Sequence, residues 1–377
     1  MHKKKLLIAT DNFLPRWDGI SRFLSLLIPK LLEDFEISVL APDFKGEKIE
    51  IDGVKVHRIK TSWFNVGDYP VPQFNPREIN IHVQNADLVF TQTIGPIGGL
   101  AIKAAWNSKK PVVAYVHSIE WELIAKSISP LKMVEYVSYN FTKKIIKSLY
   151  NKCSLIITPS IEISQVLASE GIKTLKTVVH LGIDLEIFTP AEDKKKAKED
   201  LKLDPNFRII GFCGRIGKEK DLITLYKAFV NVEKRTKYVR LLIVGDGIES
   251  QKKYFLKNKN VIITGQINNV VPYLQAMDIF VLPSLTETSS LATMEAMACG
   301  LPVISTKVGY IRSYIKEKEN GLFFPKRNET ILALKIKWLL DNEYVSRVLG
   351  ANARKTMEEN YNWEKTVNKI KYILEGF

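Results

Sequence analysis

The sequence predicts an α/β protein with two consecutive open sheets, each mostly parallel and covered by helices on both faces. Three observations predict this fold class. Short β-branched or aromatic runs alternate with stretches of helical period from end to end. The 377 residues are too many for one ordinary core. A polar, charged stretch at 183–205 interrupts the alternation, and we place a linker between the two sheets near 183–190.

The expected strands are short apolar runs, and helical patterns such as 19–34 and 161–171 separate several of them. In the first half the strands are 4–10, 35–41, 54–60, 87–93, 111–118, 154–160 and 177–182; in the second they are 207–214, 240–247, 260–265, 278–284 and 301–306. Open parallel sheets bind ligands beyond the carboxyl ends of their strands, so we expect a cleft between the two domains.

The composition, 46% hydrophobic and 25% charged, is typical of a soluble globular protein. No apolar run approaches the length of a membrane span, and the apolar stretch near the N-terminus is too short for a signal peptide. Three scattered cysteines indicate reduced core thiols, so we expect a cytoplasmic protein. The net charge of +14 comes without any RNP-like, zinc-finger or helix-turn-helix pattern, and we expect no nucleic acid partner.

The first strand is not followed by Gly-x-Gly-x-x-Gly, which argues against a nicotinamide-dependent enzyme. A different pattern follows the strand at 207–214. Gly214 allows a sharp turn, Arg215 leaves the carboxyl end of the strand, and Lys220 opens the next helix. Two cations beside a helix N-terminus suit a diphosphate, although surface Arg and Lys residues near helix starts are common.

The segment 283–303, "PSLTETSSLATMEAMACGLPV", predicts a loop followed by a buried helix that ends at Gly300. Ser289 or Ser290 can cap that helix, which places Glu287 in the loop and Glu295 about one turn inside. Carboxylates bind vicinal sugar hydroxyls well, so the two acids can bracket a ligand over the helix N-terminus. The alternative is a capping acid followed by an ordinary helical glutamate.

Taken in order, "WDGISRF", "HLGIDLEIFTP", "FCGRIGKEKDLITLYKAF", "PSLTETSSLATMEAMACGLPV" and "NGLFFP" resemble the retaining glycosyltransferases of family 4. The resemblance spans residues 6 to about 363. It implies the GT-B architecture, in which two Rossmann-like doubly wound domains face each other across a cleft. The expected domains are an acceptor-binding domain at 1–187 and a donor-binding domain at 188–362, with a final helix at 363–377 that returns to the first.

The resemblance also implies roles for individual residues. Glu295 matches the acid that holds the ribose of a nucleotide sugar, and Glu287 matches the acid beside the sugar ring. Arg215 and Lys220 match the diphosphate-binding pair, which would stabilise the leaving group without a metal or cofactor. His117 matches a histidine near the transferred sugar, so the expected catalytic residues are His117, Arg215, Lys220 and Glu287.

Gly19 matches the second glycine of the family's N-terminal loop, where the chain passes close to the diphosphate. The first glycine is Asp18 here, which departs from the pattern. The donor-binding loop departs too, because Thr288, Ser289, Ser290 and Leu291 stand where many members have Gly-Phe-Gly-Leu. We expect backbone amides there to face the sugar, while the added hydroxyls alter the donor preference.

Residues 126–152 contain six lysines and one acid, with apolar residues at helical spacing. One interpretation is a core helix with a solvated basic edge. The other is contact of Lys132, Lys143, Lys144 and Lys147 with an anionic membrane surface that presents a lipid acceptor. In that case the protein is peripheral at the inner face of the cell membrane.

The resulting hypothesis is a retaining hexosyltransferase that moves a sugar from a UDP- or GDP-linked donor to a lipid or glycan acceptor. The alternatives are a transferase with a soluble acceptor, another GT-B enzyme such as an epimerase, and a non-catalytic protein that binds nucleotide sugars. The sugar, the base, the acceptor and the oligomeric state do not follow from the sequence.

Overall fold

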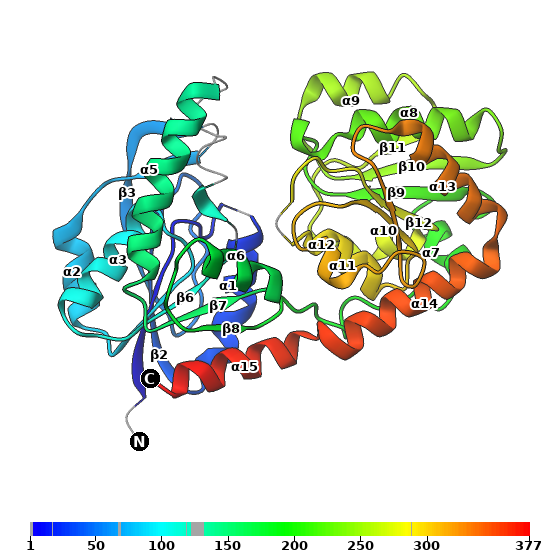
Figure 1. The fold of residues 1–377 in the computed structure, drawn as a ribbon. Coiled ribbons are helices and arrows are strands. Elements are labelled where there is room, and N and C mark those ends of the chain that lie inside the picture. Colours follow the sequence, from blue (N-terminus) through cyan, green and yellow to red (C-terminus); the bar gives the residue numbers. More distant parts are fainter. Residues whose placement is uncertain (1–2, 17, 67–68, 118, 122–131, 288) are drawn as a thin grey trace. The chain divides into compact units, whose positions relative to one another are not determined.

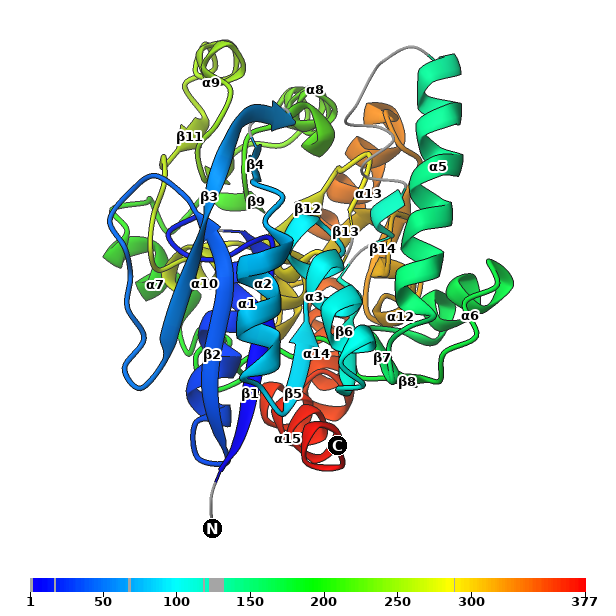
Figure 2. The same cartoon turned by 90° about the vertical axis from the view of Figure 1, so that its left-hand side faces the viewer.

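The computed structural model describes residues 3–16, 18–66, 69–117, 119–121, 132–287 and 289–377. The chain divides into two compact units, residues 1–180 with 367–377 and residues 181–366. The expected boundaries, 187/188 and 362/363, lie a few residues from these. Each unit contains one sheet with helices around it (Figures 1 and 2), which confirms the predicted α/β class with two open sheets.

The N-terminal unit contains an eight-stranded sheet in the order β4-β3-β2-β1-β5-β6-β7-β8. Its strands are β1 (Lys4–Ala9), β2 (Phe35–Asp43), β3 (Lys55–Val66), β4 (Tyr69–Pro72), β5 (Leu88–Thr91), β6 (Val112–Tyr115), β7 (Leu155–Thr158) and β8 (Lys176–Val178). All neighbours pair in parallel except β3 and β4. The carboxyl ends of the parallel strands therefore share one edge of the sheet.

Strand β4 is the one strand of this sheet that the sequence does not predict. Its sequence, Tyr-Pro-Val-Pro, contains two prolines, and proline is typical of turns rather than of a central strand. The strand lies at the edge of the sheet beside β3, where one side of its backbone needs no partner. Its edge position is therefore the reason that the prolines are tolerated.

Helices of the N-terminal unit cover both faces of its sheet. They are α1 (Gly19–Leu31), α2 (Pro76–Gln84), α3 (Pro96–Asn107), α5 (Lys132–Tyr150) and α6 (Ile161–Ser169). Helix α3 contacts both α2 and α5, and these three lie on one side of the sheet while α1 lies on the other (Figure 1). The central strands are buried on both faces, as in other parallel sheets.

The C-terminal unit contains a six-stranded sheet in the order β11-β10-β9-β12-β13-β14, and all its pairings are parallel. The strands are β9 (Arg208–Cys213), β10 (Val239–Val244), β11 (Val261–Ile263), β12 (Ile279–Leu282), β13 (Val303–Thr306) and β14 (Leu322–Phe324). The sequence predicts the first five of these. Strand β14 has only three residues, too few to show a strand pattern.

After the linker, the described residues form the helices α7 (Lys194–Asp200), α8 (Leu222–Glu233), α9 (Glu249–Phe255), α10 (Val271–Ala276), α11 (Leu291–Ala298), α12 (Ile311–Tyr314), α13 (Glu329–Asp341), α14 (Glu343–Asn360) and α15 (Trp363–Glu375). A 3-10 turn, η1 (Lys218–Lys220), precedes α8. Helix α15 begins in the C-terminal unit, and its residues from Val367 onward belong to the N-terminal one. There Lys371 pairs with Asp34 at 2.6 Å.

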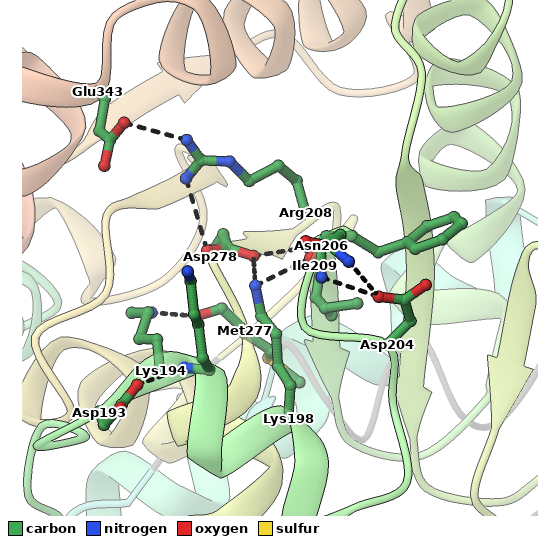
Figure 3. A network of polar contacts seen from close by, with 12 residues as sticks. Asp193, Lys194, Lys198, Asp204, Asn206, Arg208, Ile209, Met277, Asp278 and Glu343 are labelled. Carbon is green, nitrogen blue, oxygen red and sulfur yellow. Dashed lines mark hydrogen bonds and ion pairs between the residues drawn. The ribbon is translucent and has the colours of Figure 1, made fainter.

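A buried ion pair fastens α7 to the amino-terminal end of the second sheet (Figure 3). The Lys198 ammonium lies 2.8 Å from the Asp278 carboxylate, and the two side chains are 5% and 9% exposed. Lys198 also donates to the Phe207 carbonyl at 2.8 Å, and the Ile209 amide donates to Asp278 at 2.7 Å. Both charges are thus paired and hydrogen-bonded, as buried charges must be.

Removing the lysine of this pair should destabilise the C-terminal unit strongly. Lys198→Ala leaves the buried Asp278 carboxylate with only the partly exposed Arg208 guanidinium, 3.7 Å away, as a cation, and losing one partner of a buried pair costs up to about 3–5 kcal/mol. Lys195→Ala, at an exposed position of the same helix, should change the free energy of unfolding by less than about 0.5 kcal/mol. Chemical denaturation measures both values, and equal small losses in the two variants would contradict the assigned role of the buried pair.

Candidate functional site

The carboxyl edge of the second sheet carries the residues expected to bind a donor. Strands β9 and β12 are neighbours, so the loops that follow them lie side by side at this edge. Gly214 follows β9 with a φ of 144°, in the region that favours glycine, and turns the chain away from the sheet. The Leu285 amide donates to the Glu219 carbonyl at 2.8 Å, and this bond joins the two loops.

Lys220 and Glu287 form an ion pair across these two loops. The ammonium lies 2.5 Å from Glu287 Oε1, and the side chains are 21% and 9% exposed. The Ser284 hydroxyl donates to the same oxygen at 2.7 Å. The sequence places these two residues 67 positions apart, and the structure brings them into contact. One cation and one anion therefore occupy the same small area of the sheet edge.

Arg215 lies two residues beyond the end of β9 and is paired within its own loop. Its guanidinium donates to Glu219 Oε1 at 2.9 Å, and its side chain is 61% exposed. An exposed ion pair contributes little to stability because solvent screens it. The guanidinium can therefore exchange this carboxylate for another anion at low cost.

The loop before α11 is held in an unusual backbone conformation. Ser290 has a φ of 49°, which is the left-handed region and costs a residue other than glycine about 1 kcal/mol. Its hydroxyl contacts the Thr293 hydroxyl at 2.8 Å, and the buried Tyr314 hydroxyl donates to the Ser289 carbonyl at 2.8 Å. Serine thus stands here in the conformation that glycine adopts most easily. Of the other predicted loop residues, Leu291 begins α11 and Thr288 lies outside the described residues.

A serine stands at the N-cap of α11 as predicted, but it does not form the expected capping hydrogen bond. Ser290 does occupy the N-cap position, but its side chain bonds no backbone amide of the helix. The left-handed backbone at Ser290 turns the hydroxyl toward the Thr293 side chain instead. The Ser289 hydroxyl is buried and has no hydrogen-bond partner among the described residues. Glu295 lies in the second turn of the same helix and is 2% exposed.

Asp18 caps α1 in the N-terminal unit. Its carboxylate accepts from the amides of Ile20 and Ser21, both at 2.9 Å. Burial raises the pKa of this carboxyl, and the amide bonds oppose that effect. Gly19 is exposed, and an added Cβ would meet nothing within 4 Å inside its unit. The amides of Ile20 and Ser21, beside Gly19, are therefore already occupied by an internal carboxylate.

His117 lies two residues beyond the end of β6 and is 8% exposed. Its ring stacks on Tyr115 with centroids 4.6 Å apart and meets the edge of Phe23 at 5.1 Å. Its Nε2 atom lies 2.9 Å from Gln92 Oε1. Burial lowers the pKa of this imidazole to about 3, so the ring is neutral at physiological pH.

The lysines of α5 do not all have the same surroundings. Lys143 forms an ion pair with Glu170 on the C-terminal side of α6, and this partner raises the pKa of the ammonium. Lys144 and Lys147 are exposed, and Phe141 and Ile145 are exposed large apolar side chains on the same helix. Lys132 begins α5. The outer surface of this helix thus combines cations with apolar groups.

The sequence interpretation misses a partly buried acid in the N-terminal unit. Glu120 Oε1 accepts from the Tyr150 hydroxyl at 2.8 Å, and Oε2 is buried without a partner among the described residues. Burial raises the pKa of this carboxyl to about 7. Nothing in "YVHSIEWE" distinguishes Glu120 from a solvated acid, because its partner lies 30 residues further along the chain.

Replacing Glu120 should make the protein more stable at high pH. The native carboxyl binds its proton more tightly than the unfolded one, so the stability that it contributes is fully present below pH 4.5 and is lost as the pH rises from there through 7. Glu120→Gln should therefore unfold with a free energy roughly 1–2 kcal/mol above wild type at about pH 8, and with little difference at about pH 4. Denaturation at both pH values checks this, and Glu36→Gln at an exposed position is the control. A difference that does not depend on pH would contradict the explanation.

Two features are absent from the residues that the structure describes. No cluster of three or more His, Cys, Asp or Glu side chains there could hold a metal ion. In the same residues, no helix is both long enough and apolar enough to cross a membrane.

Two protein-family models match consecutive parts of the chain. The model of the group 1 glycosyl transferases matches residues 193–356. The model of glycosyltransferase family 4 matches residues 17–187. Together they cover both units.

Three similar proteins cover between 63% and 100% of this chain. An uncharacterised glycosyltransferase of Methanocaldococcus jannaschii is 25% identical over 100% of this chain and 99% of its own length. A GDP-mannose-dependent α-mannosyltransferase of Corynebacterium glutamicum is 25% identical over 92% of this chain and 83% of its own. An α-monoglucosyldiacylglycerol synthase of Streptococcus pneumoniae is 27% identical over 63% of this chain and 56% of its own.

The crystal structure of HepE from Anabaena in complex with UDP has the same fold. It superposes with a TM-score of 0.80 at 17% identity and covers 99% of this chain and 100% of its own. The fold is thus the GT-B class, with two parallel-sheet Rossmann-like domains. With this fold and both family models matched in order, the chain belongs to the group 1 glycosyltransferases, of the family 4 type.

Proposed function

We propose that this glycosyltransferase moves a hexose from a nucleoside diphosphate sugar to a lipid or glycan acceptor at a membrane surface, with retention at the anomeric carbon. The observation that carries the proposal is the Lys220–Glu287 pair at the carboxyl edge of the second sheet. It offers a cation for a phosphate and a carboxylate for sugar hydroxyls within one hydrogen bond of each other.

On binding a diphosphate, Arg215 and Lys220 would exchange their present carboxylate partners for phosphate oxygens. Lys220 and Arg215 pair with Glu287 and Glu219, so each side chain already lies at the edge where an anion is expected. A diphosphate carries more charge than a carboxylate and accepts more hydrogen bonds, which favours the exchange. The exchange would also release Glu287, whose oxygens could then accept from the sugar.

The same cations suit the transition state. The bond between the anomeric carbon and the leaving diphosphate breaks, and negative charge grows on the diphosphate oxygen. Fixed cations stabilise that charge more than they stabilise the ground state. We propose that the acceptor hydroxyl attacks on the face that the diphosphate leaves and passes its proton to the departing diphosphate oxygen, because no side chain among the described residues is an evident nucleophile. A glycosyl adduct trapped on a side chain would contradict this route.

The relatives support the donor and acceptor classes. HepE was crystallised with UDP and with UDP-glucose, and the C. glutamicum relative is named for GDP-mannose. The S. pneumoniae relative is named for a glycosylated diacylglycerol. We therefore propose a UDP- or GDP-linked hexose as the donor and a lipid as the preferred acceptor class.

The exposed side of α5 supports contact with a membrane. Lys144 and Lys147 can approach anionic headgroups, and Phe141 and Ile145 can bury apolar area at the interface. Lys143 takes a smaller part in this proposal than its sequence suggests, because Glu170 already neutralises it. A membrane contact would place the N-terminal unit at the surface that holds a lipid acceptor.

Release of free nucleotide from a panel of UDP- and GDP-sugars tests the reaction. We expect release from one donor, stimulation by a membrane lipid extract, and retention at the anomeric carbon in the product NMR spectrum. Arg215→Ala should lower kcat/KM by about 100-fold, the typical effect of losing one group that stabilises the transition-state charge. Glu219→Gln, which removes the partner of Arg215 but keeps the guanidinium, should retain activity.

The outcomes of this panel separate the alternatives. Release that lipid does not change would indicate a soluble acceptor. Nucleotide binding without release from any donor would favour the non-catalytic alternative. Equal losses in Arg215→Ala and Glu219→Gln would show that the loop conformation matters rather than the guanidinium, and would contradict the assigned role of Arg215.

Sedimentation with vesicles that contain phosphatidylglycerol tests the membrane contact. Lys144→Gln combined with Lys147→Gln should weaken vesicle binding by about tenfold or more, since each lysine near an anionic surface contributes about 1 kcal/mol. Lys143→Gln should weaken it less, because Glu170 already pairs with that lysine. Nucleotide binding should not change in either variant. Unaltered sedimentation of the double variant would reject the contact.

A further inference from the structure

We infer that Gln92 is a positioning residue that holds His117 in its Nε2–H tautomer and so leaves Nδ1 to accept a hydrogen bond from a sugar hydroxyl. The inference rests on the proposed function, because the transferred sugar is the expected partner of His117. The observation behind it is the 2.9 Å contact between His117 Nε2 and Gln92 Oε1. An amide oxygen only accepts hydrogen bonds, so the ring nitrogen that faces it must carry the proton.

Both residues are attached to a rigid part of the sheet. Gln92 follows β5 and His117 follows β6, and these strands are neighbours. The Gln92 amide donates to the Ala9 carbonyl at 3.0 Å, and the Val116 amide donates to the Ile157 carbonyl at 2.9 Å. The sheet therefore fixes the main chain at Gln92 and immediately before His117.

The ring itself has little freedom. Tyr115 stacks on one side and Phe23 packs edge-on, with centroid distances of 4.6 and 5.1 Å. Packing limits how the ring can tilt, but aromatic contacts do not distinguish one ring nitrogen from the other. The choice of tautomer therefore depends on the hydrogen bond to Gln92.

Burying the Gln92 amide costs free energy, and packing alone does not explain why a polar residue stands there. The residue is fully buried, and its Nε2 atom has no hydrogen-bond partner among the described residues. An unpaired buried donor costs about 1–3 kcal/mol. An apolar side chain of similar size would fill the same space without that cost. What such a side chain could not supply is an acceptor for His117 Nε2–H.

The other ring nitrogen is then available to a ligand. Among the residues that the structure describes, none donates to His117 Nδ1. In the Nε2–H tautomer that atom has a lone pair and no proton, so it recognises a donor such as a hydroxyl and rejects another acceptor. Burial keeps the ring neutral, which preserves the lone pair across the physiological pH range.

Two-bond ¹⁵N–¹H NMR spectra of the 377-residue chain test the tautomer directly. The chain has five histidines, and comparison with His117→Ala assigns the His117 signals. We expect a neutral Nε2–H ring in the wild type and a mixture of tautomers in Gln92→Leu. Phe23→Leu, which alters the packing but keeps the hydrogen bond, should leave the tautomer unchanged. A wild-type Nδ1–H ring, or a Gln92→Leu ring that is still wholly Nε2–H, would overturn the inference.

The variant Gln92→Glu provides a second test, the pH dependence of kcat/KM. That dependence would not change if Gln92 acted only in packing. The carboxylate keeps the acceptor and adds a negative charge, so the pKa of His117 should rise by about 1–3 units. For the donor that is turned over, kcat/KM should then fall at low pH in Gln92→Glu, because protonation removes the Nδ1 lone pair. The wild-type profile should not show a step that depends on His117.

The NMR and kinetic experiments together distinguish a failure of this inference from a failure of the proposed function. If the wild type turns over no donor, the proposed function fails, and the NMR spectra still decide whether Gln92 sets the tautomer. If the wild type is active but Gln92→Leu keeps the wild-type kcat/KM, the positioning role fails and the proposed function stands. A Gln92→Glu variant with a raised His117 pKa and a flat profile would likewise overturn the role of the Nδ1 lone pair.

Discussion

Parallel pairing of the strands is the constraint on which both units depend. In a parallel sheet every strand runs in the same direction, so the loops that can carry chemistry all leave from one edge. Parallel pairing alone therefore brings residues from distant parts of the sequence together at that edge. Lys220 follows β9 and Glu287 follows β12, yet they are in contact because these strands are neighbours. In the same way, Gln92 meets His117 because β5 lies beside β6.

The two edges differ in electrostatic character. The edge of the C-terminal unit carries ions that range from the nearly buried Glu287 to the exposed Arg215, and each already has a partner of opposite charge. At the edge of the N-terminal unit, the imidazole of His117 is neutral and the carboxylate of Asp18 is bonded to backbone amides. The first arrangement suits exchange with a charged ligand, while the second suits hydrogen bonds to a neutral one. This division agrees with a diphosphate in one unit and hydroxyl groups in the other.

Local sequence patterns predicted the parts of the fold that depend on local physics. Alternating apolar runs predicted the strands of both sheets apart from β4 and β14, which are an edge strand with two prolines and a strand of three residues. The family resemblance supplied the candidate site residues. What neither could show was which charges are already paired, because such pairs depend on side-chain positions between distant segments. Lys143 with Glu170 and Glu120 with Tyr150 are pairs of this kind.

The structure explains physically one residue that departs from the family pattern. Asp18 replaces a glycine, and its carboxylate occupies the first amides of α1. A phosphate oxygen at the same amides would have to displace that carboxylate and would meet its negative charge at close range. The C-terminal unit offers no such conflict, because its cations hold their carboxylate partners through side chains that can move apart. In the proposed reaction, the diphosphate would therefore depend on Arg215 and Lys220 of the second sheet for its charge balance, while Asp18 stabilises α1.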